Sequence, residues 1–128
     1  ANFLQFNLVA SNMSVHKLFE TCTWMKQYSN HITLSILRSP KIFSESAVPY
    51  TERDVYLSSA KQLLKFPVSV YNASRFRNNV NLLIKKYAES KYDPGLHLHL
   101  ADEIAEQDSH RTLKLQDVDG FLSQWINA

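Results

Sequence analysis

Two histidines separated by one residue, His97 and His99, come nearest to a metal site in this sequence. On a β-strand both imidazole rings would project from one face, where they could bind a metal or, with Arg111 nearby, a phosphate group. A third ligand could come from the acidic residues that follow, which are Asp102, Glu103 and Glu106. On an α-helix the two rings would point about 200° apart and no site would form. Histidine is also an ordinary polar residue of an amphipathic segment, so we predict no metal and no cofactor.

Covalent catalysis has little support. The single cysteine, Cys22, lies between Leu18 and Met25 in an apolar stripe with helical spacing, which is typical of a core residue. No serine stands in a Gly-x-Ser-x-Gly turn, and two glycines are too few for a glycine-rich phosphate loop. We therefore assign no catalytic residue and do not expect an enzyme. A small metal- or phosphate-handling enzyme that uses His97 and His99 is kept as a second alternative.

The most informative polar residues lie in a segment, 73–90, whose apolar residues recur at helical spacing. Arginine and asparagine side chains read the edges of guanine and adenine, and lysines hold phosphates. The segment therefore predicts a nucleic-acid-binding helix, with Asn78 and Asn79 as candidates for base contacts. Two lysines of the preceding helix extend the basic surface, and the full predicted set is Arg75, Arg77, Asn78, Asn79, Lys85, Lys86, Lys61 and Lys65. A solvated helix face of ordinary charge is the alternative interpretation.

Charge is unevenly distributed along the chain, although the formal net charge is only +2. Residues 51–92 hold eight arginines and lysines against three acidic residues, whereas residues 93–128 hold two against seven. Such asymmetry favours a surface that faces a polyanion or a charged partner. Alternatively, the basic and acidic segments pack side by side and neutralise one another within one monomer, in which case nucleic-acid binding would not be detected at moderate salt.

The apolar pattern predicts four helices and two strands. Alternating residues indicate strands near 3–9, with Leu4, Phe6 and Leu8 on one side, and near 31–37, with Ile32, Leu34 and Ile36 packed against helix stripes. Helical spacing predicts helices near 15–28, 52–65, 73–90 and 117–126. Residues 96–107 fit either a strand or a helix, and Asp93-Pro94-Gly95 before them reads as a turn.

Each helix has an expected buried face. The helix at 52–65 should bury Val55, Tyr56, Ala60, Leu63 and Leu64. The helix at 73–90 should bury Phe76, Val80, Leu83, Ile84 and Tyr87. The last helix should bury Val118, Phe121, Leu122, Trp125 and Ile126, although Gly120 inside it costs about 1 kcal/mol relative to alanine. We therefore predict one α+β domain over residues 1–128 that is predominantly α-helical.

Composition narrows the class of protein further. Hydrophobic residues make up 45% of the 128 residues, enough for a real core. No apolar run is long enough to span a membrane, no signal peptide is visible, and one cysteine excludes an internal disulfide, so we expect an intracellular protein, cytoplasmic or nuclear.

The leading functional hypothesis is a non-enzymatic domain that binds nucleic acid, DNA in the first instance, through the basic helix at 73–90. The alternative is a protein-interaction or assembly domain, in which the basic middle of one copy meets the acidic C-terminal third of another copy or of an acidic protein partner.

Overall fold

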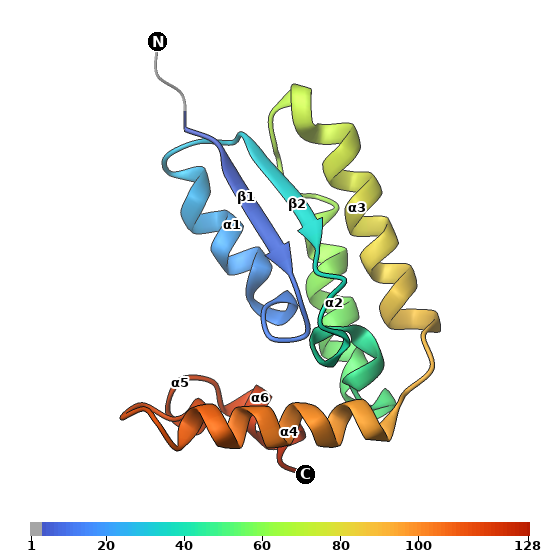
Figure 1. The fold of residues 1–128 in the computed structure, drawn as a ribbon. Helices are drawn as coiled ribbons and strands as arrows, with labels where there is room; N and C mark the ends of the chain where they lie inside the picture. Colours follow the sequence, from blue (N-terminus) through green and yellow to red (C-terminus); the bar gives the residue numbers. More distant parts are fainter. Residues whose placement is uncertain (1–3) are drawn as a thin grey trace.

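The chain begins with a strand–helix–strand unit in the computed structural model, which describes residues 4–128. Strand β1 (Phe6–Ala10) is followed by a 3₁₀ turn, helix α1 (Leu18–Lys26) and strand β2 (Ile32–Ile36). The strands pair in parallel, with Phe6 opposite Ile32 and Ala10 opposite Ile36. A tight hairpin cannot join parallel strands, so α1 is the crossover that returns the chain to the start of the sheet (Figure 1).

Within the described residues, five further helices follow this unit. Three 3₁₀ turns between residues 41 and 52 lead to the helices α2 (Arg53–Leu63), α3 (Val70–Glu89), α4 (Pro94–Asp108), α5 (Leu115–Val118) and α6 (Gly120–Ile126). Helix α3 runs beside β2. Helix α4 lies across the lower end of the other elements in the view of Figure 1, and α6 packs against it. The predicted α+β class with mostly helical content is confirmed.

One face of the two-stranded sheet is buried and the other is open. The buried face carries the alternate residues Leu8, Ala10, Ile32 and Leu34, which join a core with apolar side chains of α1, α2 and α3. The open face carries Asn7, Thr33 and Ser35. Both hydroxyls donate to the Asn7 side-chain oxygen, at 2.9 Å from Thr33 and 3.3 Å from Ser35. The sheet thus separates an apolar interior from a mainly polar surface that also carries the exposed Val9.

Both predicted strands are present, each shorter than expected. The strand predicted over 31–37 spans Ile32–Ile36, and Ile36 is only partly buried. The strand predicted over 3–9 spans Phe6–Ala10, and residue 3 lies outside the described residues. Leu4, expected on the inward side, is 51% exposed because it precedes the paired part of the strand.

The first three predicted helices are confirmed, with differences in what they bury. Four of the five residues expected inside α3 are buried, and Ile84 is partly buried. On α2, Val55 was expected inside but is exposed, and Leu64, which follows the helix, is partly buried. Tyr56 is buried as predicted, and because adjacent residues point about 100° apart on a helix, Val55 is turned away from the core.

The C-terminal helix predicted over 117–126 is two helices. The backbone is extended at Asp119, with φ −151° and ψ 91°, and the Asp119 carboxylate accepts a hydrogen bond from the Leu122 N–H at 3.1 Å as the N-cap of α6. Val118, predicted to be buried, lies before this break and is exposed. Trp125 and Ile126 are buried as predicted, whereas Phe121 is only partly buried.

The ambiguous segment 96–107 belongs to α4. The Asp93 carboxylate accepts hydrogen bonds from the N–H groups of Gly95 and Leu96, at 2.9 and 3.3 Å, and Pro94 occupies the first helical position. Asp93-Pro94-Gly95 is therefore a helix start and not the predicted turn.

Membrane-spanning helices are not found in the described part of the chain. Helix α3 has the necessary length, 20 residues, but arginines and lysines interrupt its apolar pattern. No helix within residues 4–128 is both long and apolar enough to cross a bilayer.

A cationic cleft at the carboxyl ends of the strands

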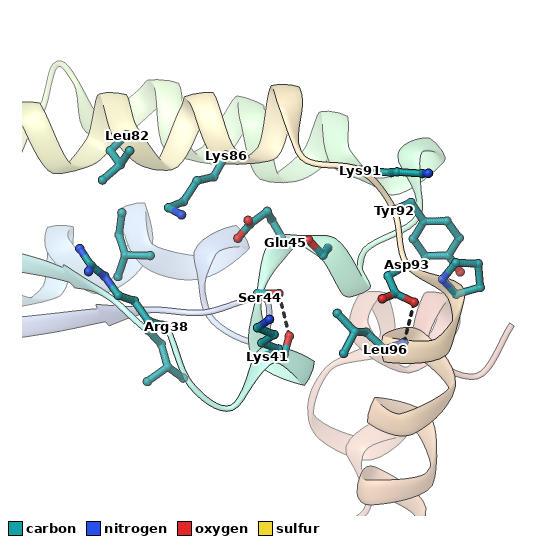
Figure 2. A pocket seen from close by; sticks show the side chains of 14 residues that line it. Arg38, Lys41, Ser44, Glu45, Leu82, Lys86, Lys91, Tyr92, Asp93 and Leu96 are labelled. Atoms are coloured by element: carbon teal, nitrogen blue, oxygen red, sulfur yellow. Dashed lines mark hydrogen bonds between the residues drawn. The ribbon is translucent and has the colours of Figure 1, made fainter.

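An open cleft with a volume of about 950 Å³ lies at the carboxyl end of β2. Its walls come from the segment that follows β2, the last turns of α3, and the segment that leads into α4 (Figure 2). In open sheets of parallel strands, ligands bind in the crevice outside the carboxyl ends of the strands. The cleft lies in the corresponding position beside this two-stranded parallel sheet.

Four cationic side chains line the cleft: Arg38, Lys41, Lys86 and Lys91. In Figure 2, Lys86 reaches from α3 and Arg38 from the segment after β2 into the space between them, while the Lys91 side chain points away from this space at the rim. None of the four forms an ion pair with another residue in the range 4–128. The cleft thus carries positive charge that no carboxylate neutralises by direct pairing.

The two carboxylates of the cleft are engaged elsewhere. Glu45 accepts a hydrogen bond from the Ser90 hydroxyl at 2.9 Å. Asp93 accepts hydrogen bonds from the first N–H groups of α4, where the helix dipole also favours a negative charge. Both carboxylates therefore help to hold the walls of the cleft in place through these hydrogen bonds.

Asn12 joins the segments that follow the two strands. Its side-chain amide donates to the carbonyls of Ile42 and Ser44, both at 2.8 Å, and its backbone N–H donates to the Phe43 carbonyl at 2.9 Å. Asn12 is fully buried, and its own carbonyl accepts a hydrogen bond from the Tyr56 hydroxyl at 2.6 Å. The base of the cleft is in this way connected to the core.

Arg53 holds together the wall formed by the turn at Glu45 and the end of α3. Although only 3% exposed, it has no carboxylate partner in the described structure; its guanidinium donates to the carbonyls of Val48 at 3.0 Å and Glu45 at 3.1 Å. It also donates to the carbonyls of Tyr87 and Ser90, at the C-terminal end of α3, where the helix dipole is negative. Burial lowers the pKa of Arg53, which the nearby Tyr50 and Glu45 partly oppose. Arginine nevertheless stays charged.

His97 anchors the start of α4. Its Nε2 lies 2.8 Å from the Trp125 carbonyl and 3.0 Å from the Ile126 carbonyl, so this nitrogen must carry the hydrogen. Its Nδ1 lies 2.6 Å from the Tyr92 hydroxyl, which then donates to it in the neutral ring. The Tyr92 N–H in turn donates to the Tyr50 hydroxyl at 2.9 Å. These bonds connect the wall formed by the segment that leads into α4 to helix α6 and to the turn before α2.

The predicted pair of histidines is not brought together. Because residues 96–107 are helical, His97 and His99 point about 200° apart. His97 is buried and fully bonded, whereas His99 is exposed. Within residues 4–128, no three side chains of the metal-binding types are grouped.

The predicted nucleic-acid-binding residues do not share one face of α3. Arg75 and Arg77 are two residues apart, so they point about 200° apart around the helix. Asn78 and Lys85 are exposed, and so are Lys61 and Lys65 of the α2 region. Of the predicted set, only Lys86 lines the cleft.

Asn79 has a structural partner. Its side-chain amide donates to the Leu34 carbonyl at 2.7 Å, on the edge of β2 that faces α3. Asn72 donates to the Ile32 carbonyl of the same edge at 3.5 Å. Helix α3 is thus bonded to the outer edge of the sheet through two asparagines, and Asn79 has a role other than base contact in this structure.

The acidic C-terminal third forms no direct ion pair with α3 in the described part of the chain. Its ion pairs within the described residues join Arg111 to Asp108, His110 to Glu106, and Asp119 to His16 and Lys17. None of them reaches a basic residue of α3.

Arg38 and Lys41 were missed by the sequence analysis. Both lie within five residues after β2, and the predicted order strand, helix, strand over residues 3–37 already favours a parallel pair. The carboxyl ends of parallel strands could therefore have been searched for polar residues. The contributions of Lys91 and Asp93 have no such local signal, because they depend on the packing of α4.

Comparisons with known proteins add no relative to this description. No protein-family model, no curated protein and no solved structure matches the chain.

Proposed function

We propose that this chain binds nucleic acid and holds its phosphates along the side of α3 that faces β2. One stripe of α3 supports this proposal most directly. Arg75, Asn79, Leu82 and Lys86 follow one another at spacings of four, three and four residues, so they lie on the same side of the helix. The stripe carries a cation at each end and no acid.

A smaller hollow continues the cleft along this stripe. It has a volume of about 290 Å³ and shares Arg38, Leu82 and Lys86 with the cleft, and Asn79 and Ser35 extend it along β2. We call the cleft and this hollow together the groove. Arg38, Lys41 and Lys86 line this groove, and Arg75 continues the stripe about one turn of α3 beyond Asn79. These four cations supply the positive charge that attracts a phosphodiester backbone.

The proposed contacts are made to phosphates and not to base edges. Asn79 donates its amide to Leu34, and Asn78 lies on another side of the helix from the stripe. Contacts to phosphates carry no direct sequence information. The chain should therefore bind different sequences with similar affinity, in contrast to the base readout expected from the sequence.

Fluorescence anisotropy with labelled random-sequence single strands and duplexes, measured over a salt series, tests the proposal. Four phosphate contacts should give a log–log salt slope of about −2.8 on a single strand and about −3.6 on a duplex. Arg75→Gln and Lys86→Gln should each reduce the affinity and flatten the slope by about 0.7 to 0.9. Arg77→Gln removes the same charge from the opposite side of α3 and is the matched control. Equal losses in all three variants, or no binding at low salt, would contradict the proposal.

A protein-interaction function has support at the opposite end of the sheet. Val70 and Tyr71, at the start of α3, are 83% and 89% exposed, and Trp24 and Tyr28 of the α1 region are more than half exposed. The Ser69 N–H donates to the Asn30 carbonyl at 2.8 Å, which joins the two regions. Exposed aromatic residues are enriched at protein interfaces.

Sedimentation at low and high salt separates this second function from one based on charge. Self-association through the apolar residues should persist at high salt and be lost in Val70→Ser with Tyr71→Ser. Leu113→Ser, at an apolar residue elsewhere that is 64% exposed, is the control. Self-association that dissolves with salt would instead favour contact between basic and acidic surfaces.

A further inference from the structure

The cleft combines cations with an apolar wall. Ile36, Leu82 and Leu96 line it together with the four cationic side chains. In Figure 2, Leu82 points from α3 into the same space as Lys86, and Leu96 lies near Lys41 on the side of α4. Small-molecule sites generally have this composition, with apolar walls and a few polar groups that fix the orientation of the ligand. A phosphodiester backbone alone would have no use for the apolar wall.

The walls of the cleft are already held in place. Arg53 bonds the turn at Glu45 to the end of α3, Asn12 bonds the segments after the two strands, and His97 bonds the start of α4 to α6. Each of these three side chains is buried. A preformed site loses less conformational entropy when it binds a ligand than one that must first become ordered.

The charge of the cleft suits a dianion. Four cations stand against two carboxylates, and those carboxylates already accept hydrogen bonds. A phosphate monoester has a second pKa of about 6 and carries close to two negative charges at neutral pH. A carboxylate or a phosphodiester carries only one. The excess of positive charge therefore matches a monoester best.

From these observations we infer that the cleft binds a small organic phosphate: a phosphate monoester on an apolar or ring-bearing body. The phosphate lies among Arg38, Lys41 and Lys86, and the body lies against Leu82 and Leu96. This site shares Arg38 and Lys86 with the proposed nucleic-acid groove but does not depend on nucleic-acid binding. A free metabolite or the phosphorylated end of a strand could supply the same chemistry.

Titration of the full chain with AMP and phenyl phosphate, followed by amide NMR shifts and calorimetry, tests this inference. Both probes should bind, with shifts concentrated in residues 36–46 and 82–96. Inorganic phosphate and adenosine, which are the two component parts of AMP, should each bind at least about tenfold more weakly than AMP. Neither organic phosphate binding, or inorganic phosphate binding as tightly as both of them, would overturn the inference.

Variants separate this site from the nucleic-acid groove. Lys41→Gln, which lines the cleft but not the smaller hollow, should weaken AMP binding about tenfold, while Arg75→Gln should leave it unchanged. Arg111→Gln, on an exposed arginine outside the cleft, controls for net charge.

Oligonucleotide binding without AMP binding refutes only this inference, and AMP binding without oligonucleotide binding refutes only the proposed function. AMP binding that is equally weakened by Arg111→Gln would overturn the site. Tight binding only of 5′-phosphorylated strands would identify a strand end as the source.

Discussion

Arg53 illustrates how a single side chain can determine the shape of a site from a distance. Its guanidinium donates four hydrogen bonds to carbonyls of two segments, which are the turn of residues 45–48 before α2 and the end of α3. Its guanidinium also lies over the Tyr50 ring, 4.8 Å from the ring centroid, in cation–π geometry. A lysine could not make this set of bonds, because its ammonium is a single point with three donors.

The Cys22 thiol should be unreactive in the folded protein. It is fully buried, and this burial raises the pKa of Cys22 to about 12. The thiolate, which is the reactive form, should then amount to only about one part in ten thousand at pH 8. A thiol reagent such as Ellman's reagent should label the chain only after denaturant is added. Stoichiometric labelling within minutes in native buffer would contradict this placement of Cys22.

The Asp119 carboxylate should make the stability of the folded chain fall at acid pH. Burial alone would raise the pKa of Asp119, but hydrogen bonds from His16 at 2.6 Å and the Leu122 N–H at 3.1 Å, with Lys17 nearby, lower it instead. Because the folded-state pKa is depressed, the stabilisation is present above the unfolded pKa of about 3.9 and is lost as the pH falls through the folded value.

Asp119→Asn keeps the N-cap of α6 but removes the charge. The variant should lose about 1 to 2 kcal/mol of unfolding free energy at pH 5, and this difference should shrink below pH 4. Urea denaturation at both pH values measures it. Asp102→Asn, at an exposed carboxylate of α4, is the control and should change stability little. A loss that stays constant with pH would show that the charge of Asp119 is not responsible.

At the scale of elements, the edge of β2 explains why α3 lies where it does. The carbonyls of Ile32 and Leu34 point away from β1 and accept hydrogen bonds from Asn72 and Asn79 of α3. An uncovered strand edge would leave these groups without partners, at a cost in stability. The same contact turns the stripe of Arg75 and Lys86 toward the sheet.

Asn79→Ala and Asn78→Ala form a matched pair that tests this contact. Asn79→Ala should reduce the unfolding free energy by about 1 to 2 kcal/mol, because the carbonyl of the buried Leu34 loses its partner. Asn78→Ala removes the same atoms from an exposed helix position, where alanine is at least as favourable. Denaturant midpoints of the two variants give the comparison, and equal midpoints would contradict the role of Asn79.

At the scale of the whole molecule, the C-terminal helix α6 packs into the same core as α2 and α3. Trp125 is 2% exposed, its indole N–H donates to the Tyr56 hydroxyl at 3.1 Å, and its ring centroid lies 5.4 Å from that of His97. Tyr56 stacks on Tyr87 with ring centroids 4.8 Å apart. One aromatic cluster therefore joins α2, α3, α4 and α6.

Trp125→Ala should destabilise the whole chain by about 3 to 5 kcal/mol, the range for removal of a large buried side chain. A single cooperative transition at lower denaturant should result, because α6 shares its core with α2 and α3. Trp24→Ala, at the other tryptophan, which is 54% exposed, should cost much less. An unchanged midpoint for Trp125→Ala would show that the C-terminal helices are not part of the core.

Local periodicity was sufficient to predict much of the secondary structure. The stripe Phe76, Val80, Leu83 and Tyr87 identified α3 and its buried face, since helical spacing depends only on neighbouring residues. Alternation at Ile32 and Leu34 identified β2 for the same reason. Asp119 was placed at the start of one helix over 117–126 and is the N-cap of α6, a local contact with Leu122. Its bond to His16 could not be predicted, because it depends on a segment about one hundred residues away.

The tertiary structure alone decided which polar residues meet. Arg38 and Lys86 lie 48 positions apart in the sequence and line the same cleft, whereas Arg75 and Arg77 are near neighbours and point to opposite sides of α3. His97 became an anchor because its partners are carbonyls of Trp125 and Ile126. Periodicity was sufficient to predict β1, β2 and the helices α1, α2 and α3, and composition showed the excess of positive charge in the middle of the chain. The packing of α3 and α4 around the ends of the strands determined the site, because contacts between distant segments leave no periodic signal in the sequence.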